Sequence, residues 1–263
     1  MKQLSGKTVI VTGASSGLGR MLVQKVAQYQ GHPILIARSE EKLQKVAREI
    51  QSLTQKEIHY FTADVSKIEQ VRDTFRQIAE IYPQIDVLIN NAGYGVFELF
   101  QEAPEESFEK MMQVNYFGAV YCIKQVVNSM ISARKGHIIN IASQAGKVGT
   151  PKSSAYNASK HALLGFTNSL RHELKENNIY VTSINPGPIR TPFFEIADQS
   201  GKYTKNIDKY MLDPDYVAER IIDVIIKPKR EVNLPFWMEL GSRLFHLFPT
   251  GMDHFASKFL HKK

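Results

Sequence analysis

The sequence predicts one doubly wound α/β domain, in which a mostly parallel sheet of about seven strands carries helices on both faces. Short apolar segments alternate with longer helix-patterned segments along most of the 263 residues, as a parallel sheet requires. Several short segments are rich in Val and Ile, which is typical of strands buried from both sides. No Pro/Gly/Ser-rich linker or repeat divides the chain, so we expect residues 1–263 to form a single domain.

Seven segments are predicted to be strands, because each is a short apolar run bounded by polar or turn-forming residues. Connections between parallel neighbours are expected to be right-handed. In chain order the predicted strands are residues 8–12, 33–37, 58–63, 85–90, 137–142, 180–185 and 231–235.

Helices are predicted between these strands, where apolar residues recur at spacings of three and four. The two helices at 105–133 and 155–177 are long and partly apolar. The predicted helical segments are 18–30, 40–53, 68–82, 105–133 and 155–177.

Composition places the chain in the class of ordinary globular proteins, with 43% hydrophobic and 22% charged residues. Its single cysteine, Cys122, has no partner for an internal disulfide, which favours a reducing compartment. Neither a signal peptide nor a membrane-spanning apolar run is expected from the pattern. We therefore expect a cytoplasmic protein, with contact at a membrane surface left open.

Charge and metal-ligand spacing exclude other classes. The net charge of +7 comes from basic residues scattered among acidic ones, so no nucleic-acid partner is predicted. An anionic ligand or lipid headgroups stay open. His137, His161 and His172 lack metal-ligand spacing, so no metal site is expected, and Ser143 lacks the G-x-S-x-G setting of a hydrolase nucleophile.

A glycine-rich turn, "VTGASSGLGRML", follows the first predicted strand and opens the first helix. Gly13, Gly17 and Gly19 allow a tight turn and close approach of a pyrophosphate to the helix N-terminus. Because the turn stands at this position of an alternating α/β chain, it indicates dinucleotide binding rather than a purely structural turn.

A second constellation lies further along, in "SSAYNASKHALLG". Tyr156 and Lys160 are four residues apart and share a helix face, where an ammonium lowers the pKa of a phenol. Ser143 follows a predicted strand, at the carboxyl edge where open α/β sheets bind ligands. These three groups fit proton transfer to a carbonyl oxygen.

Taken in order, these motifs resemble the short-chain dehydrogenase/reductase family over roughly the first 190 residues. The resemblance implies a Rossmann-type fold and an NAD(P)-dependent activity. The motifs are "TGASSGLG", Asp64 in "ADV", "NNAG" at 90–93, Asn115, Ser143, "YNASK" at 156–160 and "PGPIRT" at 186–191.

The resemblance also implies roles. Tyr156 is expected to be the general acid/base, and Lys160 to bind the nicotinamide ribose and tune Tyr156. Ser143 is expected to orient the substrate, and Asn115 to hold a water in the proton relay. The residues expected at the cofactor are Gly13, Ser15, Ser16, Gly17, Leu18, Gly19, Arg38, Asp64, Val65, Asn91, Ala92, Gly93, Tyr156, Lys160, Ile189 and Thr191.

Each residue also has a structural interpretation. Asn115 could bond to backbone within its own helix, and Asp64 could cap the helix that follows it. Ser143 could simply end a strand, and "PGP" could be only a turn. Jointly, the ordered set favours the functional interpretation.

The end of the second predicted strand favours NADP(H) over NAD(H). Ala37 stands where a carboxylate would bind a ribose 2′-hydroxyl, and Arg38 supplies a guanidinium suited to a 2′-phosphate, with Ser15 as a further contact. Ser16 stands where many NADP-dependent relatives carry a second basic residue. The alternative is a surface Arg38 paired with Glu40 or Glu41.

Two later segments are expected to shape the substrate site. Residues 188–214 resemble the family's substrate lid, with Phe193, Phe194, Ile196 and Tyr203 as apolar contacts. Residues 235–263 form an amphipathic extension with Trp237, Leu240, Leu244, Leu247 and Phe248 near helical spacing, widened by Phe236 and Phe245. A pocket lid or subunit contact is favoured over membrane attachment, and all three stay open.

The sequence therefore predicts an NADP(H)-dependent oxidoreductase that interconverts an apolar carbonyl and its alcohol. The alternatives are a non-catalytic nucleotide-binding or scaffold protein, and a membrane-peripheral lipid or steroid reductase. By resemblance, the helices at 105–133 and 155–177 pair between subunits of a homodimer or homotetramer.

Overall fold

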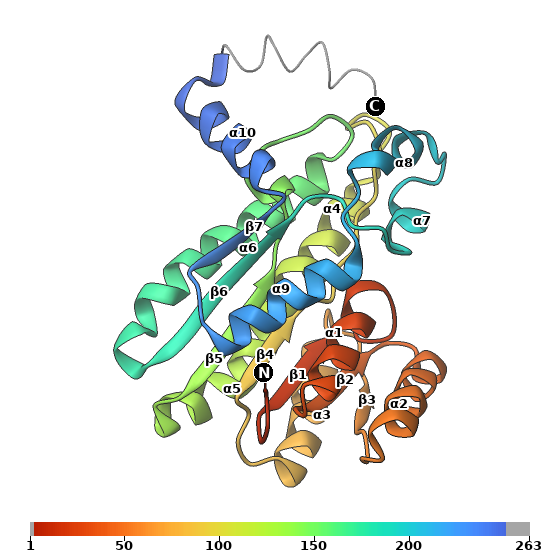
Figure 1. The fold of residues 1–263 in the computed structure, drawn as a ribbon. Helices are drawn as coiled ribbons and strands as arrows, with labels where there is room; N and C mark the ends of the chain where they lie inside the picture. The colour runs from red at the N-terminus through yellow and green to blue at the C-terminus, as the bar shows by residue number, and fades with distance from the viewer. Residues whose placement is uncertain (1–2, 251–263) are drawn as a thin grey trace.

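The computed structural model describes residues 3–250, and within them seven strands form one sheet in the order β3-β2-β1-β4-β5-β6-β7. Every neighbouring pair is parallel, so the predicted fold class is confirmed (Figure 1). The strands are β1 Thr8–Thr12, β2 His32–Ala37, β3 Tyr60–Thr62, β4 Val87–Asn90, β5 Gly136–Ile141, β6 Ile179–Pro186 and β7 Glu231–Leu234.

Helices cover both faces of the sheet, as the alternating pattern predicts. The α-helices are α1 Gly17–Gln28, α2 Glu40–Thr54, α3 Ile68–Ile81, α4 Glu105–Met112, α5 Gly118–Ala133, α6 Ser154–Glu173, α7 Phe193–Ala197, α8 Lys202–Ile207, α9 Pro214–Ile226 and α10 Phe236–Leu247. Shorter helical turns are η1 Gln113–Phe117, η2 Gln144–Gly146, η3 Lys175–Asn177 and η4 Asp208–Tyr210.

The core has two layers, one on each side of the sheet. Val9 and Val11 of β1 pack with α1, α2 and α9 in one layer. Ile10, between them, packs with α3, α5 and α6 in the other. All three side chains are fully buried, which explains why the strand sequences show no polar alternation.

The segment predicted as one helix over 105–133 is divided. α4 passes into a π-helical turn, η1, before α5 begins. A π-turn inserts an extra residue into the helix and often marks a functional site. Here it carries Asn115, which is buried.

The carboxyl ends of β1, β4, β5 and β6 meet at the edge of the sheet that also carries α7, α8 and α10. Figure 1 shows α10 at the upper left of the view and α7 and α8 at the upper right. In the part of the chain that is described, no helix combines the length and apolar character needed to cross a bilayer.

Candidate active site

A cavity of about 1040 Å³ opens at the carboxyl edge of the sheet. One end is lined by the glycine-rich turn after β1 and by the residues after β2. The other end is lined by the loops after β5 and β6, by α7 and by α10. This is where open parallel sheets bind ligands, since loops from neighbouring strands diverge there.

The glycine turn is packed against the loop after β4. Gly13 and Gly17 have φ angles of 68° and 50°, which favour glycine. A Cβ atom on Gly13 would lie 2.9 Å from Ala92 Cα, and one on Gly19 only 2.1 Å from the Gly13 carbonyl oxygen. Because neither position has room for a side chain, the turn packs directly on itself and on the backbone after β4.

Hydrogen bonds tie this turn to β4. The Thr12 hydroxyl accepts from the backbone N–H groups of Asn91 and Ala92, each at 3.0 Å. The Asn91 side chain donates to the Thr12 carbonyl at 2.9 Å. The "TG" and "NNAG" motifs thus form one structural unit.

The N-terminus of α1 lies at the cavity and has no side-chain cap. Ser16 is the N-cap residue, has extended backbone geometry and makes no side-chain capping bond. Ser15, Ser16 and Leu18 line the cavity beside it. The first N–H groups of a helix lack intrahelical partners, so this end suits an anion such as a pyrophosphate.

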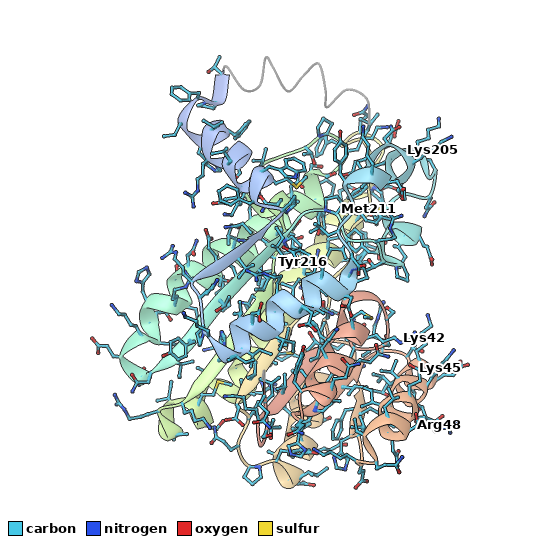
Figure 2. All side chains as sticks on the ribbon, viewed as in Figure 1. Lys42, Lys45, Arg48, Lys205, Met211 and Tyr216 are labelled. Carbon is cyan, nitrogen blue, oxygen red and sulfur yellow. The ribbon has the colours of Figure 1, made fainter. Side chains whose placement is uncertain are left out.

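Two cations border the same end of the cavity. Arg38 follows β2, and Lys42 lies one turn into α2; both line the cavity. Figure 2 shows Lys42, Lys45 and Arg48 along α2, with Lys42 at the end nearer the lid. Among the described residues, no ion pair joins Arg38 to Glu40 or Glu41, so the alternative of a paired surface arginine is not observed.

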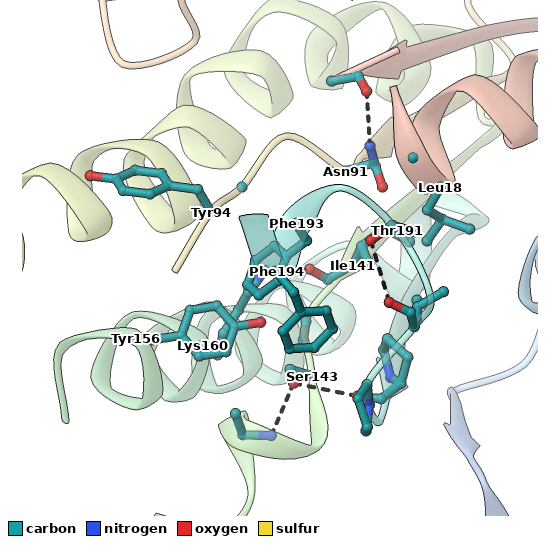
Figure 3. A pocket seen from close by; sticks show the side chains of 18 of the residues that line it. Leu18, Asn91, Tyr94, Ile141, Ser143, Tyr156, Lys160, Thr191, Phe193 and Phe194 are labelled. Carbon is teal, nitrogen blue, oxygen red and sulfur yellow. Dashed lines mark hydrogen bonds between the residues drawn. The ribbon is translucent and has the colours of Figure 1, made fainter. Parts of the chain in front are cut away.

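Tyr156, Lys160 and Ser143 converge at the other end (Figure 3). Lys160 is buried, lies 5.8 Å from the centre of the Tyr156 ring and donates to the Ile141 carbonyl at 2.8 Å. The Ser143 hydroxyl accepts from the Ala145 N–H at 3.0 Å and donates to the Pro186 carbonyl at 3.3 Å. These two hydrogen bonds hold the Ser143 side chain just after the carboxyl end of β5, where it lines the cavity.

Burial shifts the pKa values of the two titratable groups toward their neutral forms. It raises the pKa of the Tyr156 phenol to about 12, although a hydrogen bond with the Ser143 hydroxyl acts in the opposite direction. It lowers the pKa of the Lys160 ammonium to about 8. At neutral pH both groups therefore carry their protons.

Aromatic rings from two segments close the space over Tyr156. The Phe97 ring, after β4, lies 6.1 Å from the Tyr156 ring and 5.1 Å from that of Tyr203. Phe193, at the start of α7, lies 5.7 Å from the Tyr156 ring. The predicted lid contacts Phe193, Phe194, Ile196 and Tyr203 all line the cavity.

The inner side of α10 forms a further wall. Met238, Gly241, Ser242 and Phe245 line the cavity. The fit is close, because a Cβ atom on Gly187 would lie 2.6 Å from the Met238 sulfur.

A buried ion cluster holds α10 against the loop of Ser143. Glu239 of α10 is only 4% exposed and accepts from Lys147 at 2.6 Å and from Arg243 at 2.8 Å. Lys147 lies directly after η2, which begins next to Ser143. Burial acts to raise the pKa of the Glu239 carboxyl, but the hydrogen bonds from Lys147 and Arg243 lower it overall, so this carboxyl is ionised at neutral pH.

Comparison with known proteins places this site in a family. Residues 7–200 match the family described as short chain dehydrogenase. The chain belongs to the short-chain dehydrogenase family. Within the described residues, no group of three or more His, Cys, Asp or Glu side chains is arranged to hold a metal ion.

Two relatives of this short-chain dehydrogenase illustrate its range. An uncharacterized oxidoreductase of Staphylococcus saprophyticus is 36% identical over 87% of this chain and 94% of its own length. The 3-ketodihydrosphingosine reductase of Bos taurus is 33% identical over 83% of this chain and 68% of its own.

A solved structure of the same family shares the fold and holds a nicotinamide cofactor. The alcohol dehydrogenase of Thermococcus sibiricus, complexed with 5-hydroxy-NADP, has a TM-score of 0.78 and 27% identity over 87% of this chain and 94% of its own.

The structure of this short-chain dehydrogenase brings most of the predicted site residues to the one cavity. Gly19 packs behind the glycine turn, and Asn115 does not line the cavity. The predicted residues that do line it are Gly13, Ser15, Ser16, Gly17, Leu18, Arg38, Asp64, Val65, Asn91, Ala92, Gly93, Ser143, Tyr156, Lys160, Ile189 and Thr191.

Asn115 bonds outside its own helix. Its side chain donates to the Tyr94 carbonyl at 2.8 Å and to the Ser159 hydroxyl at 2.9 Å, and accepts from the Tyr94 N–H at 2.9 Å. The alternative of a bond within its own helix is therefore wrong. Its expected role in a water relay stays a prediction.

Asp64 does not cap α3. Its carboxylate accepts from the N–H and hydroxyl of Ser66 at 2.9 and 2.7 Å, which orders the loop beside the cavity. Lys67 is the N-cap residue of α3 instead.

Several cavity residues have no prediction from sequence. Lys42 carries a weak signal, since it stands one helical turn after Arg38, but Phe97, Met238 and Ser242 carry none. They reach the site through the packing of α10 and of the loop after β4, which no local pattern reveals.

Proposed function

We propose that this short-chain dehydrogenase is an NADP(H)-dependent oxidoreductase that interconverts a carbonyl and an alcohol. One observation carries the proposal: Tyr156, Lys160 and Ser143 share a cavity with a glycine turn and an open helix N-terminus. A proton donor and a dinucleotide cradle at opposite ends of one cavity are the two parts that such a reaction requires.

The residues of the cradle fit a dinucleotide. Gly13 and Gly19 let the turn pack directly on the backbone after β4, and no side chain caps the N-terminus of α1, which lies at the cavity. We infer that Gly13 to Leu18 hold the pyrophosphate, Asp64 and Val65 the adenine, and Asn91 to Gly93 the middle of the cofactor. Ile189 and Thr191 then flank the nicotinamide, which when bound supplies or accepts the hydride.

Proton transfer falls to this chain's own side chains. In the reducing direction the Tyr156 hydroxyl donates its proton to the carbonyl oxygen as negative charge develops there. Ser143 donates a hydrogen bond to the same oxygen, and the Lys160 ammonium stabilises the Tyr156 phenolate that remains. The Ser143 hydroxyl makes this bond by turning from the Pro186 carbonyl, to which it donates in the structure. In the oxidising direction the phenolate accepts the proton of the substrate hydroxyl.

The preference for NADP(H) rests on the charges at the far end of the cavity. Arg38 and Lys42 line it there, and the adjoining strand end is Ala37 rather than a carboxylate. A guanidinium pairs well with a 2′-phosphate. The measurement is kcat/KM with NADPH and with NADH, and a preference for NADH would contradict the proposal.

The walls near Tyr156 favour an apolar substrate. Phe97, Phe193 and Met238 face this end of the cavity, and burying apolar substrate surface against them is favourable. The cavity of about 1040 Å³ is large enough for a cofactor and a sizeable substrate.

Substitution of the tyrosine tests the mechanism. In Tyr156→Phe, turnover of a carbonyl panel with NADPH should fall by at least about a hundredfold, because the proton donor is lost. Cofactor binding, measured by NADPH fluorescence, should persist. Tyr180→Phe removes a hydroxyl from an exposed residue of β6 and is the matched control.

The same panel separates an enzyme from a nucleotide-binding scaffold. A scaffold would bind NADPH without oxidising it in the presence of any carbonyl, in the unsubstituted chain as well as in Tyr156→Phe. Undiminished turnover in Tyr156→Phe would instead refute the role of the tyrosine.

A further inference from the structure

The outer side of α10 is an exposed apolar surface, which we call the α10 outer face. It comprises Phe236, Leu240, Leu244 and Leu247, flanked by Trp237 and Phe248, with exposed fractions between 41% and 77%. Their spacing puts them on the side of the helix away from Met238 and Ser242, which line the cavity.

The position of α10 is fixed by the fold. The buried ion pair of Glu239 with Lys147 ties the helix to the loop of Ser143. Met238, on the same helix, packs closely on Gly187 of the loop after β6. Turning the apolar residues of α10 inward would separate Glu239 from Lys147. The α10 outer face therefore stays exposed.

The α10 outer face is continuous with the rim of the cavity. Trp237 is 55% exposed and also lines the cavity, and so does Ile196 of the lid, which is 53% exposed. A partner seated on this face would lie next to the opening through which an apolar substrate reaches Tyr156.

Cations and amphipathic aromatic rings border the same face. The Tyr210 ring lies 6.1 Å from the Trp237 ring, and the Lys209 ammonium lies 4.9 Å from the centre of the Tyr210 ring. Arg243 is largely exposed on α10 itself. Beyond the described residues, the sequence continues with Lys258, Lys262 and Lys263 against a single acidic residue, Asp253.

We propose that the α10 outer face docks on an anionic lipid bilayer and opens the cavity to a lipid that carries a carbonyl on an apolar chain. Exposed apolar residues on one side of a helix, with neighbouring cations and Trp/Tyr rings, are the pattern of an interfacial helix. This inference rests on the proposed carbonyl reduction only for the substrate, not for the docking.

A second copy of the chain fits the face less well. A symmetric contact would bring the bordering cations of both copies, Arg243 and Lys209, into one interface. Like charges oppose such a contact, whereas anionic headgroups are attracted to them.

Vesicle co-sedimentation of the full chain tests the docking. We expect binding to phosphatidylcholine vesicles that contain phosphatidylglycerol, weaker binding to pure phosphatidylcholine, and a decline with added salt. Leu240→Asp combined with Leu244→Asp should reduce the partition coefficient roughly tenfold or more, because two apolar side chains that the bilayer would bury are replaced by charged ones.

The matched control is Leu53→Asp combined with Ile81→Asp. These residues are exposed on α2 and α3, so the chemical change is the same and the location differs. This control should bind vesicles as the unsubstituted chain does. Both double variants should keep the far-UV spectrum and the turnover of a short, water-soluble carbonyl.

Several outcomes would overturn the docking proposal. One is an unsubstituted chain that stays in the supernatant with anionic vesicles. Another is an equal loss of vesicle binding in both double variants. A third is a smaller particle mass for Leu240→Asp/Leu244→Asp than for the unsubstituted chain, measured without vesicles. The last would show that a second copy covers the face.

A long-chain ketone embedded in the vesicles tests the substrate class. Its turnover should fall in Leu240→Asp/Leu244→Asp, while that of the soluble carbonyl does not. Vesicle binding without turnover of any carbonyl would refute the proposed reaction and leave the docking intact. Turnover of the soluble carbonyl without vesicle binding would refute the docking and leave the proposed reaction intact.

Discussion

At the scale of single residues, the site depends on burying groups that water would otherwise solvate. Lys160 has 5% of its surface exposed, and its ammonium retains a hydrogen bond to the Ile141 carbonyl. That bond offsets part of the cost of removing a charge from water. The remaining cost appears as the lowered pKa of Lys160, and the same burial raises the pKa of Tyr156.

These shifts predict a dependence on pH that differs between the two directions. Lys160 loses its proton as pH rises through about 8, so carbonyl reduction should fall above that pH, since the phenolate loses its neighbouring cation. Alcohol oxidation needs the Tyr156 phenolate and should increase with pH, because its pKa is raised to about 12. Measuring kcat in both directions checks this, and reduction that strengthens above pH 8 would contradict it.

Arg38 is expected to determine cofactor choice through one charged contact. Arg38→Ala should lower the ratio of kcat/KM for NADPH to that for NADH by roughly tenfold to a hundredfold, the worth of a hydrogen bond between charged groups. Lys42→Ala should lower the ratio less, since an ammonium on a flexible stem is less preorganised. Lys45→Ala, on the same helix but outside the cavity, should leave the ratio unchanged.

Among the secondary-structure elements, the ends of β1 and β4 are in contact where the glycine turn lines the cavity. Thr12 closes β1 and binds the backbone after β4, while Asn91 returns a bond to Thr12. α1 can approach this junction only because Gly19 has no side chain. The spacing of the glycines is therefore a consequence of packing as well as of ligand binding.

Gly19→Ala should disrupt this junction. The added Cβ atom would lie 2.1 Å from the Gly13 carbonyl oxygen and 2.6 Å from Asn91 Nδ2, so backbone must move. We expect a loss of about 1–3 kcal/mol in unfolding free energy and weaker NADPH binding, measured by denaturant titration and fluorescence. Gly165→Ala on α6 meets no atom within 4 Å and should be neutral or stabilising. Equal effects of the two substitutions would contradict the argument.

At the scale of the whole molecule, the lid, α10 and the sheet edge enclose the site together. Separately, α6 exposes a stripe of small residues that includes Ala158, Gly165 and Ser169. Small residues allow helices from two molecules to approach closely. This surface is consistent with the predicted homodimer or homotetramer, which stays a prediction.

Measured particle mass tests the oligomer. Light scattering should give two or four times the chain mass of 29.8 kDa. Gly165→Arg should lower that mass, because space around Gly165 is open within one chain but would be filled in a pair. A single-chain mass for the unsubstituted protein would refute the prediction.

The two predicted features of the C-terminal extension have different outcomes. Phe245 lies on the cavity side of α10 rather than widening the outer apolar stripe, so one predicted stripe is divided between two sides of the helix. The last residues of the extension, 251–263, where Lys258, Lys262 and Lys263 make the sequence basic, lie outside the described residues. Helical periodicity identifies the helix, but both its sides are apolar, so periodicity does not assign them.

The existence and chain order of the strands, the mostly parallel sheet and the glycine turn could be predicted from the sequence, because periodicity and glycine spacing are local properties of the chain; the spatial order of the strands came from the structure. The predicted strand 58–63 is longer than the observed Tyr60–Thr62, since an apolar run does not show where pairing ends. Most predicted site residues were found at one cavity because they follow strands whose carboxyl ends meet.

What surrounds these residues depends on contacts between distant parts of the chain. Lys147 and Glu239 are 92 residues apart, and their ion pair exists because β7 delivers α10 beside the loop of Ser143. The same placement makes Met238 a cavity wall and leaves Leu240 exposed. Such contacts depend on how distant elements pack, which a single sequence does not encode locally.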